Sequence, residues 1–134
     1  MMGNRVMVDR WYYTKNPPAD GDIVVFMNSQ GLYLMKRVIA RGGETIESRD
    51  GRLSVEGRAL SEPYVVHSGN PPLWMNNFGP IKVPRGELFV MGDNRDLSYD
   101  SRAPEIGPVD VNSLRGKPLY TVPRHVNDEF KIIR

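Results

Sequence analysis

The sequence predicts a mainly β fold, with antiparallel sheets that form a partly closed barrel or sandwich and carry one long irregular insertion. Thirteen glycines and eleven prolines interrupt the 134 residues at short intervals, which leaves little room for long helices. Short runs of β-branched and aromatic residues lie between them. Hydrophobic residues make up 40% and charged residues 25% of the chain, so we expect residues 1–134 to form one domain with a buried core.

Eight of these runs have the length and composition of strands. In chain order they are Arg5–Asp9, Asp22–Met27, Leu32–Ile39, Thr45–Ser48, Arg52–Val55, Ile81–Val83, Leu88–Met91 and Pro118–Val122. Asp50-Gly51 predicts a hairpin turn because this pair supplies positive φ angles, and Val55–Arg58 resembles a second tight turn. Residues 67–80 are rich in Gly, Pro and Asn and are expected as the irregular loop or insertion. A short helical pattern is confined to Val111–Leu114.

Composition excludes or disfavours several classes of site. The chain has no cysteine, which excludes disulfides, thiolate zinc sites and cysteine nucleophiles. His67 and His125 are far apart and lack metal-ligand spacing, so we expect surface or loop positions, with no metal and no cofactor. A net charge of +2 gives little attraction for nucleic acid, which we do not expect as a partner. No apolar run approaches the roughly 20 residues that a membrane span needs.

Lys36 interrupts the apolar strand expected at Leu32–Ile39. If alternation holds, Leu34, Lys36 and Val38 share one face of that strand. Burial disfavours the charged ammonium, so the lysine pKa would fall from about 10.4 toward neutrality and the amine could act as a general base. The alternative is an edge-strand lysine that deters aggregation, and this segment alone favours that alternative.

A second segment, Gly92–Arg102, follows an apolar strand and is dense in polar groups. Its aspartates alternate with its arginines, in the set Asp93, Arg95, Asp96, Asp100 and Arg102. Such spacing allows carboxylate–guanidinium pairs that lock a loop, and the serines between them can donate hydrogen bonds to an amine or a carboxylate. Interleaved arginines would repel a divalent cation, which argues against a calcium loop.

The segment Gly92–Arg102, Gly-Asp-Asn-Arg-Asp-Leu-Ser-Tyr-Asp-Ser-Arg, is very similar to the signature loop of type I signal peptidases. These are membrane-bound serine–lysine proteases that remove secretory signal peptides. Leu97 stands where the family usually has asparagine. Four further segments resemble family motifs in the expected order: the strand after the nucleophile (Gly3–Asp9), the strand before the lysine (Gly21–Phe26), the lysine motif (Lys36–Val38) and the final conserved turn (Arg115–Lys117).

The resemblance implies a fold of signal-peptidase type and a role for each site residue. Lys36 would be the general base, and Ser98 would hydrogen-bond its amine and orient it. Asp100 and Arg102 would pair to brace the loop, with Asp93, Asn94 and Arg95 helping to hold it. Extended substrates would lie beside the strand residues Tyr33, Leu34 and Met35, where a shallow apolar pocket would favour small residues such as alanine.

The resemblance also implies partners and a location. The substrates would be signal peptides of secretory preproteins, and the domain would work against a membrane surface. Met7, Trp11, Tyr12 and Tyr13 could contribute to that surface because aromatic rings suit an interface, although for any single one of them an ordinary core position is favoured. The full-length parent would be membrane-anchored with its catalytic domain on the extracytoplasmic face, and these 134 residues alone are expected to be soluble.

One departure concerns the nucleophile. In the family the serine lies in a Ser-Met-x-Pro-Thr element a few residues before the position of Gly3, and this sequence starts at Met1. We therefore expect the serine, its oxyanion-hole partners and the anchor to precede Met1, and the 134 residues alone not to cleave. Shortening of a longer chain and natural loss of the serine both remain open. Ser98 is an alternative nucleophile, although its role in the family is supportive.

Two other classes of protein remain as alternatives. A self-cleaving repressor-type protein shares the serine–lysine β fold, but it would usually lack the Gly-Asp-Asn-Arg-Asp loop and would carry a cleavage site and a DNA-binding segment. This sequence has the loop and shows neither of the other features. The second alternative is a non-catalytic β module that binds extended peptides or a partner.

Overall fold

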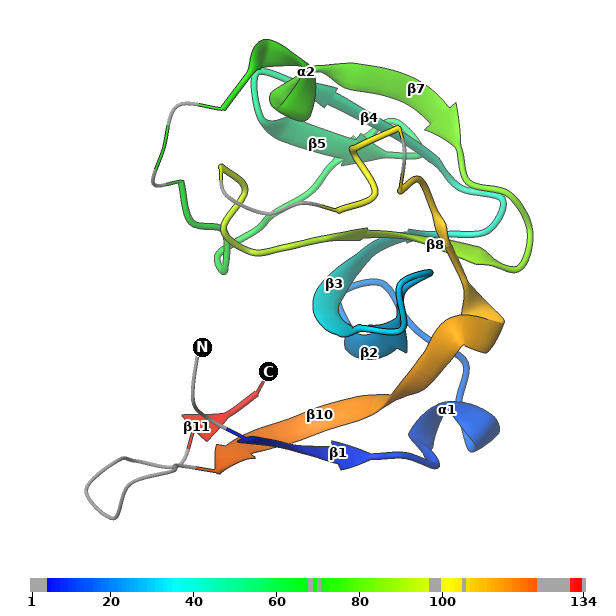
Figure 1. Ribbon diagram of the computed structural model, residues 1–134. Coiled ribbons are helices and arrows are strands. Elements are labelled where there is room, and N and C mark those ends of the chain that lie inside the picture. Colours follow the sequence, from blue (N-terminus) through cyan, green and yellow to red (C-terminus); the bar gives the residue numbers. More distant parts are fainter. Residues whose placement is uncertain are drawn as a thin grey trace.

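The protein, analysed as a computed structural model, is built almost entirely from β-strands (Figure 1). The structure describes residues 5–67, 69, 71–96, 100–104, 106–122 and 131–133. Its elements, in chain order, are β1 (Arg5–Asp9), α1 (Tyr12–Lys15), β2 (Ile23–Met27), β3 (Tyr33–Arg41), β4 (Thr45–Arg49), β5 (Arg52–Val55), β6 (Arg58–Ala59), α2 (Leu73–Asn76), β7 (Phe78–Lys82), β8 (Glu87–Met91), β9 (Val109–Asp110), the 3₁₀ turn η1 (Val111–Ser113), β10 (Leu114–Val122) and β11 (Lys131–Ile132).

The strands form two antiparallel sheets. The larger sheet has the order β1-β10-β2-β3-β8-β9, with β11 also paired to β10, and the smaller has the order β6-β5-β4-β7. In Figure 1 the smaller sheet lies above β8 and β3, and β10 and β1 lie on the opposite side of β2. The predicted mainly β, antiparallel fold is confirmed. The larger sheet runs as an open path from β1 to β9, so the described strands do not close into a barrel.

The two predicted turns connect the strands of the smaller sheet. Asp50 and Gly51, between β4 and β5, have φ angles of 52° and 82°. Glu56 and Gly57, between β5 and β6, have φ angles of 53° and 76°. Two successive positive φ angles match the twist of a two-residue hairpin, so both turns form as expected.

Two hydrophobic clusters hold the sheets. One lies between them and joins Ile39, Ala40, Phe89 and Met91 of the larger sheet to Ile46, Leu53 and Val55 of the smaller. Phe78 of β7 packs on this cluster, with its ring stacked 5.6 Å from that of Phe89. The other cluster is formed within the larger sheet by Val24, Phe26, Val38, Leu88, Val90 and Val109. Strands β3 and β8 contribute to both clusters because alternate residues face opposite sides.

Residues 67–80, expected as an irregular loop or insertion, contain two regular pieces among their described residues. Helix α2 forms one short turn, and β7 begins at Phe78 and pairs with β4. The hydroxyl of Ser48 donates to the carbonyl oxygen of Asn76 at 2.8 Å, which ties α2 to β4. Proline and glycine in this stretch suggested irregularity, but an edge strand tolerates both.

Arg115–Lys117, expected as a turn, lies instead inside β10 at an irregularity in its pairing with β2. A Cβ at Gly116 would fall on Cγ1 of Val8 and within 2.6 Å of the carbonyl oxygen of Asp9. This glycine therefore permits a close approach of β10 to β1 rather than a chain reversal.

The described helices α1 and α2 have four residues each, and neither has the length or apolar character to cross a membrane.

Candidate active site

Lys36 lies in the middle of β3, paired with Val24 of β2. Its side chain is half-buried on the face that also carries Leu34 and Val38, as alternation predicts. Burial lowers the pKa of the Lys36 amine from its usual value. The nearby carboxylate of Asp100 opposes this change and the guanidinium of Arg102 adds to it. Desolvation is the larger effect, so the neutral amine is favoured relative to a lysine in water.

Arg37, the next residue, joins β3 to the start of the signature loop. Its Nε and Nη2 donate to the two carboxylate oxygens of Asp93 at 2.9 and 2.8 Å, and its Nη1 donates to the carbonyl oxygen of Gly21 at 2.9 Å. The guanidinium also lies 3.7 Å from the ring centroid of Tyr64. Sequence reasoning gave Arg37 no role, although it sits beside Lys36 in the quoted motif. This bidentate pair fixes the strand that carries Lys36.

Arg95 is 2% exposed and pairs with Glu62. Both of its terminal nitrogens donate to the Glu62 carboxylate, and its Nε donates to the carbonyl oxygen of Gly92 at 2.9 Å. Glu62 was also missed by sequence reasoning, because no local pattern links two residues 33 positions apart. Asp93 and Arg95, expected to hold the loop, thus pair with Arg37 and Glu62 and not with each other.

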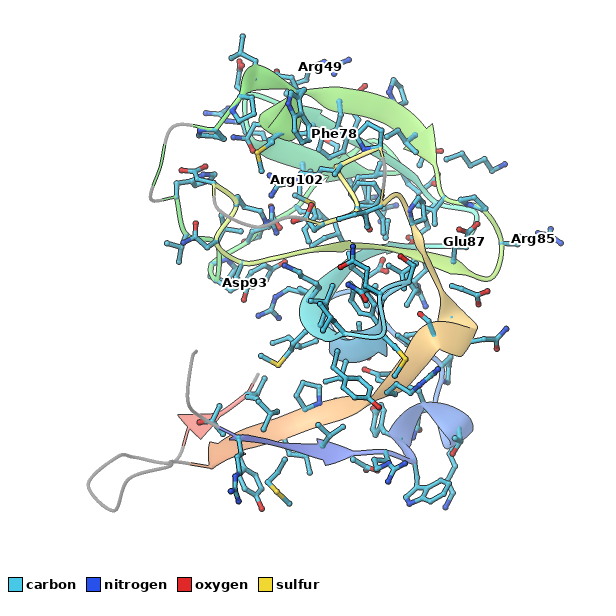
Figure 2. All side chains as sticks on the ribbon, viewed as in Figure 1. Arg49, Phe78, Arg85, Glu87, Asp93 and Arg102 are labelled. Carbon is cyan, nitrogen blue, oxygen red and sulfur yellow. The ribbon has the colours of Figure 1, made fainter. Side chains whose placement is uncertain are left out.

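Asp100 and Arg102 form the most buried ion pair of the described residues, with side chains 0% and 1% exposed. Nε and Nη2 of Arg102 donate to the Asp100 carboxylate at 2.9 and 3.1 Å. The backbone N–H of Gly92 donates to the same carboxylate, and Nη1 of Arg102 donates to the carbonyl oxygen of Met75 in α2. Figure 2 labels Arg102 between the two sheets. The pair therefore connects both ends of the signature loop to the smaller sheet.

The segment around Val66 runs beside the signature loop. Asn94 forms an isolated parallel bridge with Val66, whose N–H donates to the carbonyl oxygen of Asp93 and whose carbonyl oxygen accepts from the N–H of Arg95. His67 is exposed, and its Nδ1 lies 3.0 Å from Oδ1 of Asp96. Together these contacts hold Asp93–Asp96 in one conformation.

Ser98, predicted to orient the Lys36 amine, lies outside the described residues, as do His125 and Leu97. Its contact with Lys36 stays a prediction. The other supporting residues lie on the segment that follows β8, and their ion pairs surround the end of that strand. They are Asp93, Asn94, Arg95, Asp100 and Arg102.

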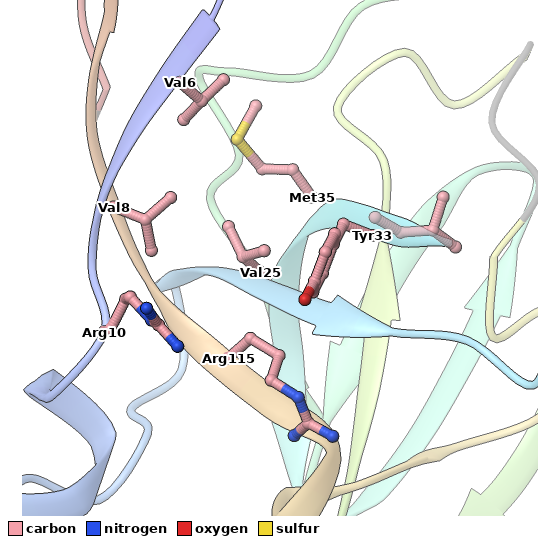
Figure 3. A pocket seen from close by; sticks show the side chains of 8 residues that line it. Val6, Val8, Arg10, Val25, Tyr33, Met35 and Arg115 are labelled. Atoms are coloured by element: carbon pink, nitrogen blue, oxygen red, sulfur yellow. The ribbon is translucent and has the colours of Figure 1, made fainter. Parts of the chain in front are cut away.

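Tyr33, Leu34 and Met35 line a cavity of about 480 Å³ next to Lys36 in β3 (Figure 3). The remaining walls come from β1, β2 and β10, through Val6, Val8, Arg10, Val25 and Arg115. The cavity is mainly apolar and open to solvent, which suits the side chains of an extended peptide.

The arrangement offers a partly desolvated lysine amine on the same strand as three residues that line a peptide-sized cavity. Such an amine can accept a proton from a hydroxyl, as a general base must. Where side chains are described, no group of three His, Asp or Glu residues is arranged to hold a metal ion.

Comparisons with known proteins identify the family of the chain. A family model described as "Signal peptidase, peptidase S26" matches residues 1–122. The chain is 34% identical to Signal peptidase I of Mycobacterium tuberculosis (strain CDC 1551 / Oshkosh), over 90% of this chain and 58% of that protein. It is 35% identical to Signal peptidase I V of Bacillus subtilis (strain 168), over 85% of this chain and 72% of that protein.

A solved structure gives the same result. The crystal structure of a signal peptidase I from Enterococcus faecalis V583 matches with a TM-score of 0.64 and 33% identity, covering 76% of this chain and 97% of that one. The chain spans little more than half the length of the mycobacterial relative. The family model covers well over half of the chain and the solved structure shares its fold, so the chain belongs to the signal peptidase family, peptidase S26.

Proposed function

We propose that this chain carries the catalytic β domain of a signal peptidase I, which cleaves signal peptides from secretory preproteins by a serine–lysine mechanism. The observation that carries the proposal is Lys36, whose half-buried amine has a lowered pKa and stands beside the braced signature loop. Family membership supports the reaction class, and the cavity supports an extended peptide as the substrate.

Lys36 acts in its neutral form. It takes the proton of a serine hydroxyl as the oxygen attacks the scissile carbonyl, and it then gives that proton to the leaving amine. A water molecule subsequently hydrolyses the acyl-serine ester, again with Lys36 as the base. Ser98 orients the amine, while the pairs Arg37–Asp93 and Asp100–Arg102 hold Lys36 and the signature loop in fixed positions relative to each other.

The substrate lies along β3. Tyr33, Leu34 and Met35 contact its side chains, and the apolar wall from Val8 and Val25 favours small residues near the cleavage site. Alanine fits this preference because its small apolar side chain packs against the Val8 and Val25 side of the cavity without burying a polar group there.

The parent protein is anchored in a membrane, with this domain on the extracytoplasmic face. Met7 and Trp11 are 45% and 70% exposed, so they are available to meet lipid. Tyr13 is a weaker candidate, because its hydroxyl donates to the carboxylate of Asp22 at 3.1 Å. Tyr12 packs edge-on against Tyr13 and lies under the Lys117 ammonium.

The nucleophile in this proposal is the serine of a Ser-Met-x-Pro-Thr element, which in the family precedes the position of Gly3. On that assignment the 134 residues alone are not expected to cleave, because Ser98 serves to orient the Lys36 amine.

The test is peptidase activity on an Ala-x-Ala signal-peptide substrate. It compares the 134 residues, a version extended upstream through the gene's own sequence, and that extension with Lys36→Ala. Only the unmutated extension is expected to cleave, and Lys36→Ala should reduce kcat/KM by about a thousandfold or more, as for loss of a general base. Lys82→Ala, at an exposed lysine of β7, is the matched control and should retain activity.

The pH profile gives a second readout. Only the neutral amine accepts a proton, so kcat/KM should rise with pH through the lowered pKa of Lys36. Cleavage by the unextended 134 residues would assign the nucleophile elsewhere, with Ser98 the first residue to replace. If the extension holds no serine element and nothing cleaves, a peptide-binding module replaces the enzyme as the interpretation.

A further inference from the structure

The cavity beside Lys36 has two chemically different ends. Figure 3 shows Val6 and Met35 at one end and the guanidinium groups of Arg10 and Arg115 at the other. Val8 and Val25 form the wall between them. A cavity whose walls are otherwise apolar therefore presents two cations at one end.

Neither arginine is neutralised by the part of the chain that the structure describes. Arg115 donates from Nη1 to the carbonyl oxygens of Asn112 and Leu114, both at 3.1 Å, and forms no ion pair with a described carboxylate. Arg10 likewise has no ion pair there. By contrast, the buried arginines Arg37, Arg95 and Arg102 each have a carboxylate partner.

The same two residues also line a neighbouring cavity of about 280 Å³, which is bounded by α1 and η1. Arg10 and Arg115 thus stand between two hollows instead of projecting from a convex surface. Exposed arginines are usually solvated and carry no function, but two unneutralised guanidiniums shared by two cavities form a positively charged concavity. Concave, low-dielectric walls strengthen attraction for an anion.

The strand register locates this concavity relative to Lys36. Lys36 pairs with Val24, whereas Leu114 and Gly116 pair with Phe26 and Val25. Arg115 therefore lies one or two residues along the strand direction from Lys36 and two strand spacings, about 10 Å, across the sheet from it. With about 3.3 Å per extended residue and the length of an arginine side chain, its guanidinium is reached about two to four residues away from a scissile bond at Lys36.

We propose that Arg10 and Arg115 form a carboxylate-binding subsite of the peptide groove. The subsite selects substrates with an Asp or Glu side chain about two to four residues from the cleaved bond. Guanidinium groups bind carboxylates through paired, charge-assisted hydrogen bonds, and the adjoining apolar wall accepts the neighbouring small side chains. This inference rests on the proposed function, because it takes the cavity to be the substrate groove.

The experiment measures binding separately from cleavage. Fluorescent Ala-x-Ala peptides carry one Glu at each position from two to four residues on either side of the bond, and each has a Gln counterpart. Binding to the upstream-extended Lys36→Ala protein is followed by anisotropy. At one position, the Glu peptide should bind about fivefold to tenfold more tightly than the Gln peptide, and added salt should reduce the difference.

Three variants assign the effect. Arg10→Gln with Arg115→Gln should remove the Glu preference, and Arg10→Glu with Arg115→Glu should replace it with a preference for Lys at the same position. Arg85→Gln, at an exposed arginine between β7 and β8, should leave the preference unchanged. Circular dichroism of each variant checks that the fold is retained, and the charge-reversed pair keeps the test meaningful because it predicts a gain of binding.

Equal affinities for Glu and Gln peptides at every position would overturn the subsite, as would a Glu preference that survives both double variants. Arginine-dependent binding to anionic vesicles without any Glu preference would assign the two residues to lipid headgroups and also overturn it. The proposed function fails separately. If the extended protein with Lys36 intact does not cleave but the arginine-dependent preference persists, the subsite stands without the peptidase.

Discussion

Among the residues that the structure describes, three arginines are buried, and each is paired with a carboxylate. Arg37, Arg95 and Arg102 are 6%, 2% and 6% exposed, and they bind Asp93, Glu62 and Asp100. A guanidinium forms several directed hydrogen bonds at once, so each pair fixes both position and orientation. The free energy gained by a buried ion pair over an apolar replacement is small, but removal of one partner leaves the other charge buried without a counter-charge. The arginines therefore hold the geometry around Lys36.

Replacing Asp100 tests this at its most buried position. Asp100→Asn leaves the Arg102 guanidinium buried without its counter-charge and should lower the free energy of unfolding by about 3 kcal/mol. Glu47→Gln is the matched control at the exposed pair Arg49–Glu47 and should cost at most about 1 kcal/mol. Urea denaturation, monitored by tryptophan fluorescence, measures the free energy of unfolding of both variants. Equal losses would mean that burial of the pair does not matter.

Asp100 also raises the pKa of Lys36 through its charge. Asp100→Asn in the active, extended protein should therefore lower that pKa further and move the rising limb of the pH–rate profile to lower pH.

At the scale of elements, local patterns predicted most of the longer strands because their causes are local, but they missed the short strands β6, β9 and β11, the first part of β10, and the helices α1 and α2. Strands β1 and β5 have the predicted bounds, and the hairpin at Asp50-Gly51 depends on two adjacent residues. Strand β7 was predicted only in its last part, because its first residues, Phe78-Gly79-Pro80, resemble a loop until they pair with β4. Tertiary pairing overrode the local preference.

The residues of the candidate site also fall into a group that local sequence predicted and a group that it did not. Lys36 and the signature loop could be identified from consecutive residues, whereas the Glu62–Arg95 pair and the cavity that Arg10 and Arg115 line depend on contacts between distant segments. The segment Arg115–Lys117 was predicted to be a turn because it resembles the final conserved turn of the family. It is part of β10, and the glycine is needed because β1 lies against it.

Gly116 provides the prediction at this scale. Gly116→Ala should destabilise the protein by about 2 to 3 kcal/mol, because its Cβ would collide with Val8 and the Asp9 backbone. Gly43→Ala is the control, since Gly43 has a φ of 90° but open space around its Cβ position, and should cost about 1 kcal/mol of backbone strain. Chemical denaturation gives both values, and a smaller loss at Gly116 than at Gly43 would contradict the close approach.

For the whole molecule, the shared core predicts that the two sheets unfold as one unit. Phe89 and Met91 of β8 pack with Ile46, Leu53 and Val55 of the smaller sheet. Arg102 adds a polar link, because it donates to the Met75 carbonyl oxygen in α2. The site is placed at this junction, since β3 and β8 belong to both clusters and Lys36 lies on β3. A substitution in the shared core should therefore disturb the position of Lys36, even where the substituted residue does not contact Lys36.

The two tryptophans report this coupling from opposite parts of the fold, because Trp11 lies next to β1 and Trp74 lies in α2 beside the smaller sheet. Trp11→Phe and Trp74→Phe each leave one reporter, and both proteins should unfold in urea at the same midpoint. Adding Phe89→Ala should lower the free energy of unfolding by about 3 to 5 kcal/mol as seen by either reporter, whereas Leu119→Ala at an exposed site of β10 should change it by less than about 1 kcal/mol. If Phe89→Ala shifted the Trp74 transition alone, the sheets would unfold separately. The smaller sheet would then be an appended unit, and the position of Lys36 would be set by the larger sheet without it.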